Sequence, residues 1–202
     1  MNKQELIQLL NTLTLDDKIT MIHGASMFQT GAVTEKNVPA FTFDDGPMGP
    51  RKEYQRDAWI PIGGNDDATS YLPSNSALAA TFNRKRALES GTILGREARG
   101  RGKDMILAPG INIHRSPLGG RNFEYMSEDP YLTAEIAVPF VEGIQQNDVS
   151  ACVKHYALNN QETDRTGYNA NVSERALWEI YLPAFRATVK KAHTMGMMGS
   201  YN

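Results

Sequence analysis

Four short apolar segments, separated by long stretches with helical spacing of apolar residues, constrain the fold more than any other feature of this sequence. The segments begin near Phe41, Asp104, Ala151 and Met197, and each interval between them has room for at least one helix. Parallel strands need a crossover of a dozen or more residues, usually a helix, and strands covered on both faces read as continuous apolar runs. The pattern therefore predicts an α/β fold with about four parallel strands and surrounding helices.

The intervals contain the predicted helices. Apolar residues recur at three- and four-residue spacing from Leu6 to Leu13, from Asp129 to Gln146 and in a segment that opens at Asn171, and a further helix is predicted from Ser76 to about Gly100. Thr14, with Asp17 three residues later, is typical of the capping pair that starts a further short helix. Pro183 has no amide hydrogen, so we expect it to kink the last helix. The segment from Lys52 to Tyr71 is predicted to be a surface loop.

The charge balance and the lengths of the apolar runs argue against several classes of protein. The chain has 21 basic and 23 acidic residues and a net charge of −2. A general nucleic-acid binder normally carries a basic stripe, and this composition does not favour one. No apolar run approaches the ~18–20 residues of a membrane span, and the first residues lack the apolar region of a signal peptide. These observations predict a soluble, cytoplasmic protein that binds neither nucleic acid nor membrane.

The sequence also lacks the usual metal and cofactor motifs. Cys152 is the single cysteine, which excludes an internal disulfide and a Cys-rich zinc site, and we expect it to be a small buried residue in a strand. The four histidines are far apart and no two share helical ligand spacing. There is no Gly-rich phosphate loop, no HExxH and no Gly-x-Ser-x-Gly. We therefore predict neither a metal nor a cofactor.

Polar residues follow each predicted strand. They are Asp44-Asp45-Gly46-Pro47, His114-Arg115 with Gly119-Gly120-Arg121-Asn122-Phe123-Glu124, Lys154-His155, and Ser200-Tyr201-Asn202. The carboxyl ends of parallel strands form the edge at which ligands bind in α/β folds. Carboxylates accept from two hydroxyls at once and Arg, Lys and His donate, so a pocket for a small, uncharged, polyhydroxylated ligand is predicted. Neighbouring strand residues face opposite ways, so only one of Asp44 and Asp45 should reach this pocket, and the residues alone leave the choice open.

A series of motifs resembles a known family. In order along the chain they are Asp45-Gly46-Pro47-Met48-Gly49-Pro50-Arg51, Leu107-Ala108-Pro109-Gly110-Ile111-Asn112-Ile113-His114-Arg115, Gly119 to Glu124, Ser127-Glu128-Asp129-Pro130-Tyr131-Leu132, Lys154-His155-Tyr156-Ala157, Ser173-Glu174-Arg175 and Met198-Gly199-Ser200-Tyr201-Asn202. Together they resemble the N-terminal part of a family 3 glycoside hydrolase, the β-glucosidase and β-xylosidase group. They cover nearly all of the chain from about Leu13 onward, and jointly they are highly specific.

The resemblance implies a binding site for the glycone, the sugar whose bond is cleaved. Its residues would be Asp45, Arg51, Leu107, Arg121, Lys154, His155, Arg165, Met198 and Tyr201. Asp45 would hold hydroxyls of the non-reducing sugar with Arg51 supporting it, and Leu107 would line the wall. The ligand would be a β-glucoside or related glycoside, or glucose. Members of the family hydrolyse O-glycosyl bonds with retention, using an Asp nucleophile and a Glu acid/base.

The sequence departs from the family pattern at the catalytic carboxylates. The nucleophile follows the next barrel strand in the family, and the acid/base comes from a later domain, so we expect no catalytic residue within these 202 residues. Residues 1–202 would be a single partial domain, the N-terminal half of a (β/α)8 TIM-type barrel, which needs about 250 residues when complete. Open sheet edges then predict dependence on the missing C-terminal barrel half or self-association. The alternative is a non-catalytic sugar-binding module or pseudoenzyme.

Several residues also have simpler interpretations. Asp44 to Pro47 could be only a turn, and Arg121 could be a solvated loop charge. Lys154 and His155 could brace a strand end against Glu162 or Asp164. Arg165 could equally pair with a nearby carboxylate, and this alternative stays open.

Overall fold

The computed structural model describes residues 1–53 and 67–202, which form two compact units. The first contains Met1–Phe43, and the second contains Asp44–Arg51 and Ala68–Asn202. Most of the surface loop predicted between Lys52 and Tyr71 lies outside the described residues. In the part of the chain that is described, no helix is long and apolar enough to cross a membrane.

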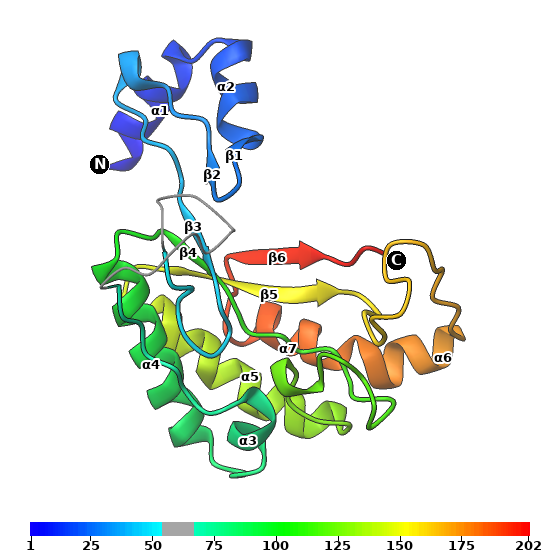
Figure 1. The fold of residues 1–202 in the computed structure, drawn as a ribbon. Coiled ribbons are helices and arrows are strands. Elements are labelled where there is room, and N and C mark those ends of the chain that lie inside the picture. The colour runs from blue at the N-terminus through cyan, green and yellow to red at the C-terminus, as the bar shows by residue number, and fades with distance from the viewer. Residues whose placement is uncertain (54–66) are drawn as a thin grey trace. The chain divides into compact units, whose positions relative to one another are not determined.

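The first unit consists of two capped helices and a small hairpin (Figure 1). Its elements are α1 (Lys3–Thr12), α2 (Leu15–Ile22), β1 (Gly24–Ser26), β2 (Gln29–Thr30) and the 3₁₀ turn η1 (Thr34–Lys36). The capping pair predicted for the second helix is confirmed, because the Thr14 side chain accepts from the Asp17 amide and Asp17 accepts from the Thr14 amide. The antiparallel hairpin was not predicted, since strands of three and two residues are too short to show alternation.

The second unit is built on a four-stranded sheet whose spatial order follows the chain. Its strands are β3 (Phe43–Asp45), β4 (Met105–Leu107), β5 (Ser150–Tyr156) and β6 (Gly196–Gly199), in the order β3-β4-β5-β6. β5 runs parallel to both β4 and β6, with Ile106 opposite Ala151 and Lys154 opposite Met198. This arrangement confirms the predicted α/β class with about four parallel strands.

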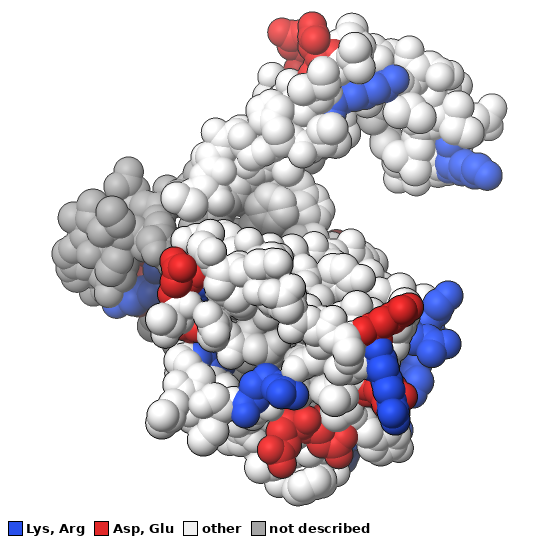
Figure 2. Space-filling model, turned by 90° about the vertical axis from the view of Figure 1, so that its right-hand side faces the viewer, with Lys and Arg blue, Asp and Glu red and all other residues white. Residues whose placement is uncertain are grey.

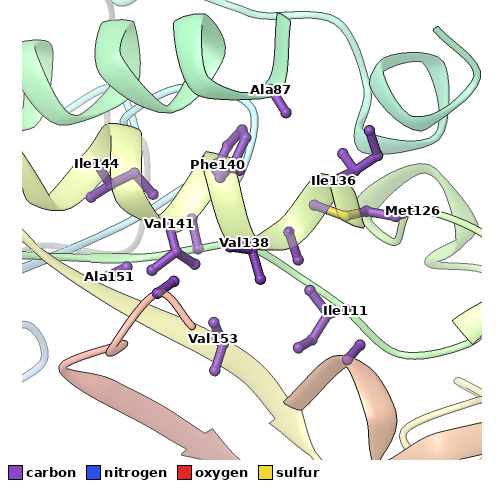
Figure 3. Close-up of a cluster of buried hydrophobic side chains, with 14 of the residues drawn as sticks. Ala87, Ile111, Met126, Ile136, Val138, Phe140, Val141, Ile144, Ala151 and Val153 are labelled. Atoms are coloured by element: carbon purple, nitrogen blue, oxygen red, sulfur yellow. The ribbon is translucent and has the colours of Figure 1, made fainter. Parts of the chain in front are cut away.

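Helices α4 (Arg84–Gly100), α5 (Pro130–Gln145) and α7 (Pro183–Lys190) lie together on one face of the sheet (Figure 1). The shorter elements are α3 (Asn75–Ala79), the 3₁₀ turn η2 (Asn122–Glu124), α6 (Glu174–Ala176) and the π-helical turn η3 (Leu177–Tyr181). α5 is the central layer of the core, because Phe140, Val141 and Ile144 are buried there with Ala151 and Val153 of β5 (Figure 3). Cys152 is buried and unpaired in β5, as predicted.

Three predicted boundaries were wrong, each for a local reason. The helix expected from Ser76 to Gly100 is divided into α3 and α4, because the Asn83 side chain accepts from the Lys85 and Arg86 amides and starts a new helix. The strand expected at Phe41 begins at Phe43, because Phe41 accepts from the Thr30 amide in the first unit.

The helix expected to open at Asn171 begins at Glu174, because the Ser173 side chain accepts from the Ala176 amide. The π-helical turn interrupts this helical segment just before Pro183. Proline cannot donate the backbone hydrogen bond that would continue the helix, which is the reason it was expected to kink there.

Candidate functional site

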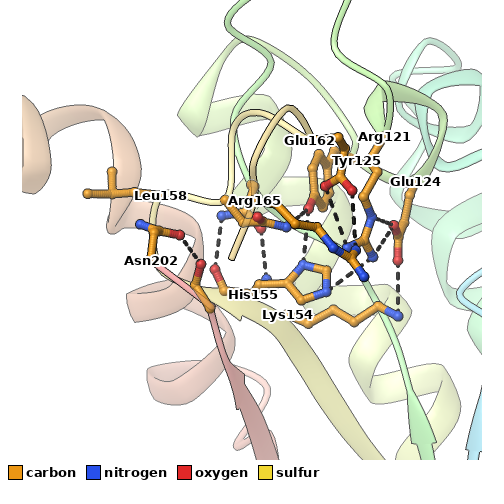
Figure 4. A network of polar contacts seen from close by, with 12 residues as sticks. Arg121, Glu124, Tyr125, Lys154, His155, Leu158, Glu162, Arg165 and Asn202 are labelled. Carbon is orange, nitrogen blue, oxygen red and sulfur yellow. Dashed lines mark hydrogen bonds and ion pairs between the residues drawn. The ribbon is translucent and has the colours of Figure 1, made fainter. Parts of the chain in front are cut away.

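Charged side chains meet at the carboxyl ends of the strands of the second unit (Figure 4). Asp45 is the last residue of β3, Lys154 and His155 stand near the end of β5, and Arg121 and Glu124 follow β4 at η2. The sheet brings Asp45 and Lys154, which are 109 residues apart in sequence, into direct contact. The predicted gathering of polar groups after the strands therefore exists as one connected cluster, which we call the strand-end cluster: Asp45, Arg121, Glu124, Lys154 and His155.

Lys154 is the buried cation at the centre of this cluster. Its Nζ lies 2.8 Å from Asp45 Oδ1 and 3.0 Å from Glu124 Oε1, and only 3% of its side chain is exposed. The backbone is fixed as well, since the Lys154 amide donates to the Pro109 carbonyl and its carbonyl accepts from Ile111. The simpler interpretation of Lys154 as a brace against Glu162 or Asp164 does not fit, because its carboxylate partners are Asp45 and Glu124.

Glu124 connects the two cations of the cluster. One of its oxygens lies 3.0 Å from Lys154 Nζ, and the other accepts from Arg121 Nε at 2.5 Å. Its side chain is 5% exposed, so this carboxylate is buried and fully engaged by cations. The sequence analysis quoted Glu124 within a motif without giving it a site role. The signal was its position three residues after Arg121, a spacing at which helical side chains meet.

Arg121 is directed by three neighbours. Besides Glu124, its Nη2 donates to His155 Nε2 at 3.1 Å, and its Nη1 lies 3.9 Å from Glu162 Oε1. The guanidinium also stands over the Tyr125 ring, 5.9 Å from the centroid. The side chain is 18% exposed, so Arg121 is not the solvated loop charge of the simpler interpretation.

The His155 ring is neutral, and the backbone of His155 is held by two hydrogen bonds to the Asn112 side chain. Burial, together with the nearby charges of Arg121, Lys154 and Arg165, lowers the pKa of His155 to about 2. The Asn112 side chain accepts from the His155 amide at 2.7 Å and donates to its carbonyl at 2.9 Å. Asn112 was not predicted as part of the site, although it belongs to one of the motifs quoted for the resemblance. Its amide fixes the backbone that presents the imidazole.

The two neighbouring aspartates have different environments. Asp44 is completely buried and its Oδ1 lies 3.7 Å from Arg51 Nε, whereas the Asp45 side chain is 26% exposed beside Lys154. The turn after them needs glycine at Gly46, because φ is +126° and a Cβ would lie 1.8 Å from the Gly49 carbonyl oxygen. Asp44 and Arg51 therefore brace the turn, and Asp45 is the carboxylate that faces outward.

The remaining predicted residues lie around the cluster. Arg165 Nη1 donates to Glu162 at 3.2 Å, so the carboxylate pairing left open for it does occur, and its guanidinium stands over the Tyr201 ring at 5.1 Å. Tyr201 is 63% exposed. Met198 is half-buried in β6 opposite Lys154, and Leu107 ends β4, also half-buried. Met198 is the strand neighbour of Lys154, and the other three flank the cluster with no hydrogen bond or ion pair to Lys154 among the described residues.

The surface and its hollows add two observations. Lysines, arginines and acidic residues are interspersed on the face shown in Figure 2, which is not the pattern of a nucleic-acid stripe. A groove of about 560 Å³ lies near Ser76, His114 and Met126 and is lined by none of the nine predicted binding residues. Among the described residues, no group of three or more His, Cys, Asp or Glu side chains could hold a metal ion.

Comparison with known proteins gives a consistent picture. Residues 62–202 match the family model described as glycosyl hydrolase family 3 N terminal domain. Beta-glucosidase BoGH3A of Bacteroides ovatus is 45% identical over 193 residues, which are 96% of this chain and 26% of that protein. An exo-alpha-(1->6)-L-arabinopyranosidase of Bifidobacterium longum is 40% identical over 190 residues, 94% of this chain and 25% of that protein.

A solved structure of another beta-glucosidase is similar to this chain in fold and sequence. Beta-glucosidase 3B from Thermotoga neapolitana, in complex with glucose, has a TM-score of 0.89 and 40% identity over 98% of this chain and 29% of that one. The four-stranded sheet and its helices thus match part of a family 3 N-terminal barrel domain, as predicted. The chain spans about a quarter of the length of the curated relatives it matches.

Proposed function

The chain belongs to glycosyl hydrolase family 3, and from this premise we propose that its strand-end cluster binds the glycone of a β-glucoside. The observation that carries the proposal is the buried Lys154 held between Asp45 and Glu124 at 2.8 and 3.0 Å. Such a network fixes an outward-facing carboxylate and two cationic donors in place before a ligand arrives. Sugar hydroxyls donate and accept at once, and preformed donors and acceptors of this kind suit them.

The proposed binding residues are those that the resemblance implied: Asp45, Arg51, Leu107, Arg121, Lys154, His155, Arg165, Met198 and Tyr201. We propose that Asp45 accepts from sugar hydroxyls, because it is the partly exposed carboxylate of the cluster. Arg121 and Lys154 would donate to the same sugar, each oriented by Glu124. Arg51 would act indirectly, through Asp44 and the turn that carries Asp45.

We further propose that hydrolysis proceeds with retention and requires two carboxylates outside residues 1–202. Of the carboxylates in the cluster, Glu124 is poorly placed for that chemistry. A nucleophile needs an oxygen free to reach the sugar, and both oxygens of Glu124 are engaged by cations. Asp45 accepts from Lys154 and from the Gly46 amide through one oxygen, an arrangement that suits binding. The protein would then be a β-glycosidase whose glycone-binding residues are in this chain.

Glucose is the sugar we propose, supported by the Thermotoga neapolitana relative, which was solved with glucose. Family membership alone does not decide it, because a relative of similar identity is an exo-alpha-(1->6)-L-arabinopyranosidase. The relatives are about four times as long, so we also propose that the cluster works together with further polypeptide, including the other half of the barrel. A cytoplasmic location stays a prediction from the sequence.

Hydrolysis of an aryl β-glucoside tests the proposal. We expect the full-length protein to hydrolyse it, and Asp45→Asn to lower kcat/KM about a hundredfold or more, because a charge-assisted hydrogen bond to the sugar is lost. The matched control is Asp16→Asn, an exposed aspartate in the first turn of α2. Residues 1–202 alone should show no turnover. Robust turnover by these residues alone would overturn the division between binding and catalysis, and equal activity of Asp45→Asn would overturn the role of the cluster.

A sugar-binding module without catalysis is the other outcome of this experiment. It would bind glucose saturably, yet the full-length protein would show no turnover of any aryl glycoside offered. Testing aryl β-xyloside and aryl α-L-arabinopyranoside beside the glucoside separates a wrong sugar from an absent activity.

A further inference from the structure

Behind the strand-end cluster, a line of hydrogen bonds connects four side chains that lie far apart in sequence. Arg121 Nη2 lies 3.1 Å from His155 Nε2, and His155 Nδ1 lies 3.0 Å from the Tyr125 hydroxyl. The Tyr125 hydroxyl in turn lies 2.8 Å from the amide of Asn159. His155 and Asn159 are 4% and 2% exposed, and Tyr125 is 3% exposed, so the line is buried. In the site described above, the Tyr125 ring lies under the Arg121 guanidinium, while the Tyr125 hydroxyl and Asn159 were given no role.

The chemistry of the first bond determines the direction of the others. A guanidinium has only donors, so the His155 Nε2 atom next to Arg121 must be unprotonated. The neutral ring carries one proton, which therefore sits on Nδ1 and is donated to the Tyr125 oxygen. A cationic ring would place a second proton against Arg121, and the neighbouring charges of Lys154 and Arg165 oppose it further. The carboxylates near this group, Glu124 and Glu162, are themselves paired with arginines.

The last bond completes the line if the Asn159 amide turns its oxygen toward Tyr125. Asn159 Oδ1 is buried without a hydrogen-bond partner among the described residues, and the Tyr125 hydroxyl proton needs an acceptor. Nitrogen and oxygen of an amide have nearly the same shape, so exchanging them keeps the 2.8 Å contact and gives the Tyr125 proton an acceptor. Each member then donates to the next, from Arg121 through His155 and Tyr125 to Asn159.

We propose that Tyr125 and Asn159 are positioning residues that hold His155 with its proton on Nδ1, so that Nε2 presents only a lone pair to Arg121 and to the glycone. Because this one lone pair already accepts from Arg121, a sugar hydroxyl that reaches Nε2 can only donate to it as a second donor beside Arg121, and Arg121 keeps a fixed orientation for its remaining donors. The part that concerns the sugar rests on the proposed function, whereas the position of the proton does not.

Nitrogen NMR of histidine-labelled protein tests the position of the proton. His155→Gln identifies the signal of His155 among the four histidines of this chain. We expect a protonated Nδ1 and a bare Nε2, unchanged between pH 5 and pH 8. A protonated Nε2, or a doubly protonated ring within this range, would overturn the proposal.

Tyr125→Phe keeps the ring and removes the hydroxyl. We expect the His155 signal to shift toward a mixture of tautomers, and glucose affinity to fall about fivefold, the effect of one lost hydrogen bond. Tyr131→Phe is the matched control, since Tyr131 is 73% exposed on α5, and neither quantity should change. If Tyr125→Phe does not fold, Asn159→Leu removes the acceptor of the Tyr125 proton and should shift the same signal. An unshifted His155 signal in the folded variant would overturn the role of these two residues.

Glucose analogues separate this proposal from the proposed function. We compare analogues in which one hydroxyl of glucose is replaced by fluorine with analogues in which it is replaced by hydrogen. Fluorine can accept a hydrogen bond but cannot donate one. At the hydroxyl that donates to Nε2, the fluorine analogue should therefore bind as weakly as the hydrogen analogue. If fluorine is tolerated better than hydrogen at every hydroxyl, Nε2 is not a pure acceptor and the proposal fails. If wild-type protein binds no glucose, the proposed function fails, and the NMR experiment alone decides the position of the proton.

Discussion

At the scale of single residues, the side chain with the largest energetic consequence is Lys154. Its ammonium group is buried between Asp45 and Glu124, and removing one partner of a buried charge network leaves the others without compensation. We expect Lys154→Met to lower the free energy of unfolding by about 3 kcal/mol. Lys191→Met is the matched control, because Lys191 also pairs with a glutamate, at 3.4 Å, but is 60% exposed.

The control should cost about 0–1 kcal/mol, as surface ion pairs do. Urea unfolding of both variants beside wild type measures the difference. Equal destabilisation by the two substitutions would show that the cluster is not a buried charge network.

His155 should make stability depend on pH in a defined direction. Its pKa is lowered to about 2 in the folded protein from an ordinary value of 6.5, so the unfolded chain binds the additional proton between these values. The stabilisation is present in full above pH 6.5 and is lost progressively as pH falls toward 2. Between pH 7 and pH 5 we expect His155 to account for a loss of about 2 kcal/mol.

The measurement compares urea unfolding of wild type and His155→Gln at pH 5, 6 and 7. The variant should be less stable at pH 7 and should lose less stability on acidification. Parallel pH curves for the two proteins would contradict a buried neutral histidine.

The sequence predicted the members of the cluster better than it predicted their partners. Residue chemistry could not decide whether Asp44 or Asp45 belongs to the cluster. The decision depends on which of the two carboxylates pairs with Arg51, and in the structure it is Asp44. Glu124 was passed over for a similar reason. Its contact with Lys154, thirty residues away, leaves no local pattern in a single sequence, and its local spacing from Arg121 was not used.

At the scale of elements, the packing of α4 against α5 depends on glycines. A Cβ at Gly91 would lie 2.1 Å from the Phe140 carbonyl oxygen, and one at Gly143 would lie 2.3 Å from the Leu88 carbonyl oxygen. Backbone atoms cannot move aside as a flexible side chain would, so the two helices approach closely only because these residues lack side chains. The helices were predicted from their apolar spacing, but this crossing was not.

A matched pair of substitutions in α4 tests the crossing. We expect Gly91→Ala to lower the free energy of unfolding by about 2 kcal/mol or more through overpacking. Gly100→Ala, at an exposed position of the same helix with nothing within 4 Å, should be neutral or stabilise by about 0.5 kcal/mol. Thermal or urea unfolding measures both, and a tolerated alanine at Gly91 would show that the helices are further apart.

Element types followed from periodicity, while boundaries depended on competing contacts. α5 and β4 appeared where they were predicted, because the run from Asp129 to Gln146 has helical spacing and the short apolar run at Met105 lies between two long helices. The break before α4 was missed because the apolar residues before and after Asn83 were assigned to one helix. The capping side chain of Asn83 outweighs that pattern.

At the scale of the whole molecule, β3 and β6 stand at the two edges of the described four-stranded sheet. Edge strands present unpaired backbone groups to other chains, whereas a closed barrel has no edges. We expect residues 1–202, studied alone, to self-associate or to need a partner segment. Sedimentation velocity across a range of concentrations measures this, and a cooperatively folding monomer at all concentrations would contradict it.

Calorimetric titration with glucose tests most directly whether the strand-end cluster is a glycone site. We expect the full-length protein to bind glucose saturably at one site, Asp45→Asn to weaken binding at least tenfold, and Asp16→Asn to bind as wild type does. Absence of glucose binding by the wild-type protein, or unchanged affinity in Asp45→Asn, would contradict the assignment of the cluster to the sugar.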